Sequence, residues 1–156
     1  MDDELRDALD HIAIGRLLSA YADVVNRRAW GELHALFQPD AVVRVDTVTN
    51  PVVTCSGPGE LGTFIGGAIE RFSFFEFVVL NAHVDLRTGG DPDAATARVF
   101  MCELRQDRVT GDFSRAFGLY RDRYRRADGR WAFAGRDYQS LARTGGEVFP
   151  LPDDAR

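Results

Sequence analysis

A turn dipeptide in the C-terminal third constrains the fold more than any other feature of the chain. Asp128-Gly129 separates two segments in which apolar and polar residues alternate, within residues 113–140. Asp-Gly between such segments is the strongest short-range signal for a β-hairpin, because both turn positions need residues that tolerate positive φ. With these two residues in the turn, the expected register pairs Arg126 with Trp131, Tyr124 with Phe133, Asp122 with Gly135 and Tyr120 with Asp137.

The two faces of this hairpin differ in chemistry, and we expect the aromatic face to be the inner one. Side chains alternate between the faces of a strand. The aromatic face carries Gly118, Tyr120, Asp122, Tyr124, Trp131, Phe133, Gly135 and Asp137. The other face carries Phe117, Leu119, Arg121, Arg123, Arg125, Ala132, Ala134, Arg136 and Tyr138.

Two helices are expected before the first strand. Residues 3–28 repeat apolar side chains at three- and four-residue steps, which is typical of an amphipathic helix. At about 100° per residue, Tyr21 lies near the centre of the buried stripe, Asp23 faces solvent and Asn26 lies on the shoulder of the stripe. A second short helix starts at Trp30, and Pro39 is expected to end it.

The remaining elements are expected to form a sheet with one further helix. Residues 41–48 and 95–107 have strand patterns, and residues 61–72 have helical spacing despite three glycines. Residues 74–87 begin apolar on both faces, so we expect a largely buried strand with Asn81 and His83 on the same face. Helices first and antiparallel strands afterwards indicate an α+β fold, in one domain over residues 1–156.

Composition excludes several classes of function. The net charge is −5 and the isoelectric point is about 5.2, which argues against a nucleic-acid-binding protein. Cys55 and Cys102 lack the spacing of a zinc site or a disulfide framework, so we expect reduced thiols. No apolar run is long enough for a membrane span, and the N-terminus is acidic where a signal peptide is basic, so a cytoplasmic protein is expected.

The chemistry is expected to come from polar groups on apolar surfaces, because nucleotide, serine-hydrolase and metal motifs are missing from the sequence. His83 is the histidine expected inside, and imidazole carries protons near neutral pH. Asp122 lies between two tyrosines, where burial would suit it to acid or base work. Alternatively, Arg136 neutralises Asp122 across a bulge, and the residues leave that choice open. Further candidates for substrate contact are Tyr21, Asn26, Asn81, Tyr120, Trp131 and Arg136.

The sequence resembles the SnoaL-like group of the nuclear transport factor 2-like superfamily, which includes scytalone dehydratase and bile-acid 7α-dehydratase. Three segments carry the resemblance: IGRLLSAYADVVNRRAWGELHALFQPDAVV, NAHVDLRTGGDPDAATARVFM and FGLYRDRYRRADGRWAFAGRDYQSL. The resemblance implies a cone-shaped α+β barrel. Its N-terminal helices would pack on a strongly curved, mainly antiparallel sheet around an apolar pocket, and the chains would form homodimers or homotrimers.

The resemblance transfers the catalytic pattern only in part. The dehydratases pair an aspartate with a strand histidine, and the matching positions here are Asn26 and a position near Phe77. Asp122 is similar in placement to the hairpin acid of SnoaL-type polyketide cyclases, and His83 is a candidate for a displaced histidine.

Two functions are therefore open. The first is a cofactor-independent lyase or isomerase, such as a dehydratase or cyclase, acting on a hydrophobic oxygenated molecule such as a polyketide, terpenoid or steroid. In it, Asp122 or His83 is the acid or base, and no metal takes part. The second is a non-catalytic module that uses the same pocket to bind a small molecule, or the sheet for assembly.

Overall fold

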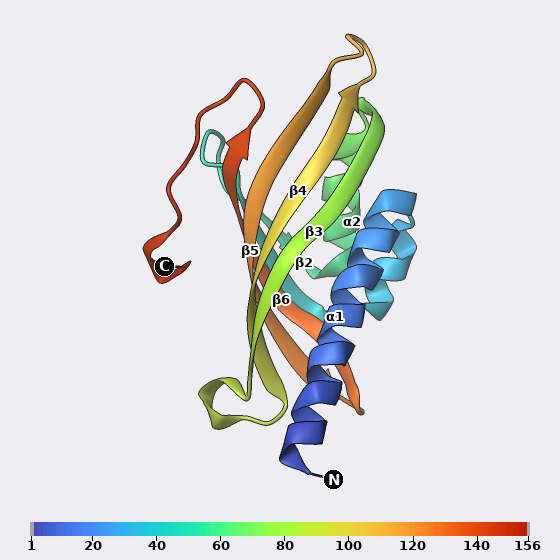
Figure 1. Cartoon of the computed structure of the whole chain (residues 1–156). Coiled ribbons are helices and arrows are strands. Elements are labelled where there is room, and N and C mark those ends of the chain that lie inside the picture. The colour runs from blue at the N-terminus through green and yellow to red at the C-terminus, as the bar shows by residue number, and fades with distance from the viewer. Residues whose placement is uncertain (1, 156) are drawn as a thin grey trace.

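The computed structural model describes residues 2–155, in which helices cover one face of a curved six-stranded sheet (Figure 1). The strand order is β2-β1-β6-β5-β4-β3, so β2 and β3 are the two edges and the sheet does not close into a full barrel. Only β1 and β6 run parallel; the other neighbours are antiparallel. The expected α+β fold with a mainly antiparallel curved sheet is confirmed.

Helix α1 (Asp3–Arg27) supplies the wall that lies across the concave face of the sheet. It begins where the Asp2 side chain accepts a hydrogen bond from the Glu4 N–H, and it ends at Arg28, whose φ of 56° is left-handed. The buried residues include those expected from the helical spacing, with Tyr21 among them. Asp23 faces solvent and pairs with Arg27, as its position on the helix indicates.

The segment after α1 differs from the expectation in where its strand begins. A 3₁₀ helix (Trp30–Ala35) replaces the expected short α-helix, and β1 (Phe37–Asp46) already includes Pro39. Proline fits there because the pairing of β1 with β6 is irregular between Phe37 and Val42, so its missing N–H breaks no regular ladder. A short strand β2 (Val53–Ser56), which the sequence patterns did not indicate, follows at the edge of the sheet.

Helix α2 (Gly57–Ile69) packs beside the 3₁₀ helix and β1. A Cβ atom built on Gly62 or Gly66 would lie 3.1 Å from the Trp30 side chain, so both glycines allow the helix to approach that ring closely. The two glycines therefore serve the packing of α2 against Trp30.

Strand β3 (Phe72–Leu86) is an edge strand, and the expectation that it is largely buried is wrong. Its pairing with β4 (Ala94–Asp107) skips Leu80, because Val79 pairs with Met101 and Asn81 pairs with Phe100. This bulge reverses which residues face the core in the second half of the strand. Val84 and Leu86 consequently pack on the core, while Asn81 and His83 are exposed.

The hairpin of β5 (Phe113–Ala127) and β6 (Arg130–Arg143) has the expected turn, with φ of 51° at Asp128 and 74° at Gly129. The pairs Arg126–Trp131 and Tyr124–Phe133 are confirmed. The other two expected pairs are wrong, because β6 contains one extra residue, Ala134. In the structure Asp122 pairs with Arg136, and Tyr120 pairs with Tyr138.

This second bulge exchanges the faces of β6 beyond Ala134. Arg136 and Tyr138, which were expected on the outer face, are buried. Asp137, which was expected inside, pairs instead with Arg123 on the outer side of the hairpin. The C-terminal tail returns along the outer face, where Asp154 pairs with Arg121 (Figure 1).

A substitution at Gly118 tests the packing that holds Tyr138 in place. A Cβ atom on Gly118 would overlap Cε2 of the buried Tyr138 ring, so the ring must leave its site. We expect Gly118→Ala to lower the free energy of unfolding in urea by about 1–3 kcal/mol, as overpacked cores do. Gly67→Ala is the control, because a Cβ there meets no atom within 4 Å; equal stability of the two variants would contradict the packing described.

Candidate functional site

An apolar cavity of about 80 Å³ lies between α1, α2 and the concave face of the sheet. Most of its wall is aliphatic or aromatic, and α2 contributes one whole side. The apolar lining residues are Val25, Val43, Val45, Leu61, Phe64, Ile65, Ala68, Ile69, Phe75 and Phe77. Four polar side chains complete the lining: Tyr21, Tyr120, Tyr138 and Glu103. Such a mixture of apolar walls and a few polar groups is typical of small-molecule sites.

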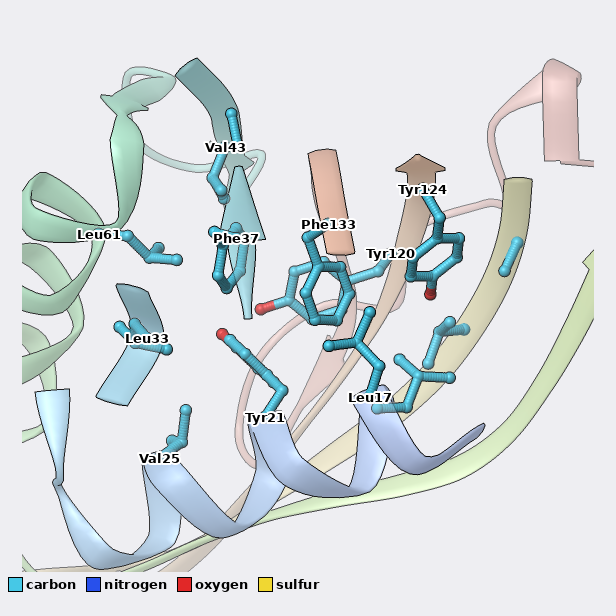
Figure 2. Close-up of a cluster of buried hydrophobic side chains, with 14 of the residues drawn as sticks. Leu17, Tyr21, Val25, Leu33, Phe37, Val43, Leu61, Tyr120, Tyr124 and Phe133 are labelled. Carbon is cyan, nitrogen blue, oxygen red and sulfur yellow. The ribbon is translucent and has the colours of Figure 1, made fainter. Parts of the chain in front are cut away.

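Tyr21 and Tyr120 place two hydroxyl groups side by side at the cavity. Figure 2 shows the two oxygens pointing toward one another beside Phe37. The Tyr21 ring packs edge-on against Phe37, Phe77 and Phe133, which fixes its direction. Burial raises the pKa of Tyr21, and it raises the pKa of Tyr120 well above the ordinary value. Both groups therefore stay protonated at neutral pH and can donate hydrogen bonds.

A buried guanidinium lies against the faces of these two rings. The Cζ atom of Arg136 is 4.4 Å from the ring centroid of Tyr21 and 3.8 Å from that of Tyr120. Arg136 offsets part of the rise in the pKa of both tyrosines. A positive charge at this distance favours negative charge near their hydroxyl oxygens.

Asp122 compensates the charge of Arg136 in the protein interior. Arg136 Nε donates to Asp122 Oδ1 at 2.7 Å and Nη2 donates to Oδ2 at 3.0 Å, and neither side chain is exposed. The Tyr124 hydroxyl donates to Asp122 Oδ2 at 2.7 Å. Burial lowers the pKa of Arg136, but Asp122 and the tyrosines raise it by more. Of the two alternatives that the sequence left open, the structure shows neutralisation of Asp122 by Arg136 across the bulge.

Glu103 is the carboxylic acid in the cavity wall. It lies on the concave face of β4, opposite Phe77, and its side chain is 26% exposed. Burial raises the pKa of its carboxyl group, while the guanidinium groups of Arg105 and Arg143 offset part of that rise. The nearby Tyr138 also has a pKa raised by burial, to about 12. A carboxyl group with a raised pKa beside apolar walls is suited to taking and returning a proton.

The other candidates from the sequence lie away from this cavity. Asn26 holds the main chain of Phe77: its Nδ2 donates to the Phe77 carbonyl at 3.1 Å, and its Oδ1 accepts from the Phe77 N–H at 2.6 Å. The Trp131 indole N–H donates to Asp10 at 2.9 Å. Asn81 is exposed, and the expectation that His83 is inside is wrong, because its side chain is 63% exposed and lies 3.3 Å from Asp85. The structure thus brings together Tyr21, Tyr120, Asp122 and Arg136 but not the remaining candidates.

Glu103 and Tyr138 were not among the candidates from the sequence. Glu103 lies in a run of charged and polar residues, ELRQDR, that resembles a solvated strand end. Its position along the strand could have indicated burial, because Glu103 shares a strand face with Met101 and Val99, both of which are buried. Tyr138 was assigned to the outer face because a bulge at Ala134 leaves no mark in the alternation of the sequence.

Within residues 2–155, no group of three or more His, Cys, Asp or Glu side chains is placed to hold a metal ion. None of the described helices is long and apolar enough to cross a membrane. Cys55 and Cys102 are buried free thiols, and burial raises the pKa of both, so neither has the character of a reactive nucleophile.

Removal of the Asp122 carboxylate tests whether the buried pair is structural. Asp122→Asn leaves Arg136 charged and uncompensated in the interior, so we expect a loss of about 3–5 kcal/mol in the free energy of unfolding. Asp137→Asn is the matched control on the same hairpin. Its partially exposed pair with Arg123 is expected to contribute less than about 1 kcal/mol. Similar small losses in both variants, measured by chemical denaturation, would contradict the assignment.

The raised pKa of Glu103 predicts a specific pH dependence of stability. As the pH rises from the ordinary range of glutamate, the unfolded chain loses its proton before the folded one, so ionisation favours unfolding until the folded carboxyl has ionised as well. Glu103→Gln removes this penalty. We expect its free energy of unfolding to rise relative to the wild type with increasing pH. Glu76→Gln, at an exposed glutamate, is the control. A flat difference for Glu103→Gln would show that the carboxyl is not perturbed.

Comparison with solved structures shows which proteins share this architecture. The fold matches a putative scytalone dehydratase from Novosphingobium aromaticivorans with a TM-score of 0.78, at 20% identity and 96% coverage of both chains. It matches a hexachlorocyclohexane dehydrochlorinase (LinA) Type2 with a TM-score of 0.78, at 19% identity, over 97% of this chain and 99% of the other.

The LinA-type3 dehydrochlorinase of Novosphingobium barchaimii matches with a TM-score of 0.77, at 22% identity, over 96% of this chain and the whole of the other. Among curated proteins, none matches the sequence significantly. The SnoaL-like domain matches residues 6–137, which is most of the chain. The protein therefore belongs to the SnoaL-like domain family.

Proposed function

We propose that the protein is a cofactor-independent acid/base enzyme that converts a hydrophobic, oxygen-bearing small molecule in the cavity between α1, α2 and the sheet. The observation that carries the proposal is the arrangement of Glu103 in the same apolar wall as the protonated Tyr21 and Tyr120 hydroxyls. The family and the structural neighbours named as a dehydratase and dehydrochlorinases support a lyase or isomerase.

The proposed reaction begins with proton transfer next to a carbonyl group. The Glu103 carboxylate takes a proton from the adjacent carbon. The C–H electron pair forms a carbon–carbon double bond, and the π pair of the carbonyl moves to its oxygen to give an enolate. Tyr21 and Tyr120 donate hydrogen bonds to that oxygen, and the charge of Arg136 behind their rings stabilises the negative charge. Return of the proton from Glu103 to the far carbon of a conjugated enolate gives isomerisation. Attack of the enolate carbon on a second carbonyl of the same molecule closes a ring, and the alkoxide formed there takes the proton. Departure of a β-substituent with its bonding electrons gives elimination.

Asp122 enters this proposal indirectly. Its two oxygens are occupied by Arg136 and Tyr124, so it positions the guanidinium rather than touching the substrate. A catalytic role of His83 stays a prediction from the sequence. His83→Ala in the assay below tests it, since a loss of at least about 100-fold would support the role and an unchanged rate would remove it.

The walls suggest a ring-bearing substrate such as a polyketide, terpenoid or steroid. Aromatic rings from α1, α2 and the sheet share the cavity wall with aliphatic side chains, several of them from α2. A cavity of about 80 Å³ must widen to hold such a molecule. We expect α2 to move for this, because its glycines give it a low helix propensity.

Deuterium exchange gives a direct test that needs no knowledge of the natural substrate. We expect the protein to accelerate deuterium incorporation at the α-carbon of 2-tetralone in D₂O, followed by NMR. Glu103→Gln should lose at least about 100-fold of this rate, the lower end for general acid/base catalysis. Tyr21→Phe should lower the exchange rate by about 100-fold, because it removes a hydrogen-bond donor to the enolate oxygen. Glu76→Gln is the control, and a folded Glu103→Gln variant with the wild-type rate would refute the mechanism.

One observation favours a second candidate, a non-catalytic module that binds a small molecule in the same cavity. Asn26 stands at the position that matches the aspartate of the dehydratases, and its side chain has no carboxyl group. The nitrogen and the oxygen of its amide are both hydrogen-bonded to the main chain of Phe77. Saturable binding of 2-tetralone with no exchange above the buffer rate would support this alternative.

A further inference from the structure

We propose that the cavity takes a ligand with an anionic group, a carboxylate on a hydrophobic body, and that Arg105 and Arg143 bind this group at the end of the cavity formed by Glu103 and Tyr138. The inference rests on the proposed function, because it specifies which hydrophobic molecules the same cavity receives.

Arg105 is placed on the face of the sheet that forms the cavity. It follows Glu103 by two residues on β4, and its Nη1 lies 3.6 Å from Glu103 Oε2, beyond hydrogen-bond distance. The guanidinium is stacked over the ring of Phe72 at 5.2 Å, and the side chain is only 17% exposed. Its Nε is buried and has no acceptor among the described residues.

Arg143 approaches the same point from β6. Its Nη2 donates to Ser140 Oγ at 3.1 Å, and the Ser140 hydroxyl lies 3.3 Å from that of Tyr138, which lines the cavity. The Nε of Arg143 is also buried without an acceptor in the described part of the chain. Hydroxyl groups therefore connect the cavity wall to this second guanidinium.

The charges at this end of the cavity are unbalanced. Arg105 and Arg143 both act on Glu103, which is one carboxyl group for two guanidinium groups. A buried donor without an acceptor costs free energy, and guanidinium edges that contain Nε match the geometry of a carboxylate. Arg121 also has a buried Nε without an acceptor, but its Nη1 already binds Asp154 on the outer face. Arg105 and Arg143 have no such hydrogen-bonded carboxylate, so a ligand carboxylate fits here.

The experiment compares two probes of the same size and shape, 2-naphthoate and 2-naphthamide, by isothermal titration calorimetry. We expect the wild type to bind the carboxylate about tenfold more tightly than the neutral amide. Arg105→Gln and Arg143→Gln should each remove most of this preference while the affinity for 2-naphthamide stays within about twofold. Arg98→Gln, on the outer face of β4, is the matched control and should keep the preference.

The outcomes separate this inference from the proposed function. If the wild type binds 2-naphthamide as tightly as 2-naphthoate, the anion site is refuted while the cavity remains a ligand site. A preference for 2-naphthoate that persists in both arginine variants also refutes the anion site. Two variants are used so that the test remains possible if one of them fails to fold. If neither probe binds and 2-tetralone does not exchange, both proposals fail. Loss of the preference on raising the salt concentration would support a charge-based site.

Discussion

The contact between Arg136 and Asp122 is the interaction on which the rest of the site depends. A guanidinium without exposure is stable only when a carboxylate compensates it, and the two hydrogen bonds from Arg136 to Asp122 provide that compensation. The pair needs Arg136 to point inward, which requires the extra residue at Ala134 in β6. One bulge thus determines that a positive charge lies behind two tyrosines, and so gives an otherwise apolar cavity its electrostatic character.

The elements that depend on local pattern could be read from the sequence. The hairpin turn, its first two residue pairs and the buried face of α1 follow from an Asp-Gly dipeptide and from helical spacing. The errors begin at bulges, beyond Tyr124 in the hairpin and beyond Val79 in β3. Strict alternation assumes that no residue is skipped, and the energetic reason for skipping one lies in contacts with distant strands. His83 and Arg136 were therefore assigned to the wrong faces for the same physical reason.

The site residues also divide into those that local sequence pattern could predict and those that depend on the assembled fold. Tyr21 and Tyr120 could be proposed because aromatic residues at inward positions are expected to be buried, whatever their partners. For Glu103, alternation with Val99 and Met101 indicates an inward position, but a carboxylic acid is recognised as part of a cavity only when the apolar residues around it are known. Those residues come from α1, α2, β1 and β3, which are far apart in the chain. A perturbed acid is thus a property of the assembled fold and not of its own strand.

The bond between Asn26 and Phe77 has a consequence for how the molecule behaves in a crowded solution. An edge strand presents free N–H and C=O groups that can recruit a strand from another chain and start aggregation. The Asn26 amide satisfies both groups of Phe77 as a neighbouring strand would, and Arg28 binds the carbonyl oxygen of Phe72 nearby. An amide at this position offers both a donor and an acceptor, which a carboxylate does not. Asn26 thus shields part of the open edge of the sheet from intermolecular pairing.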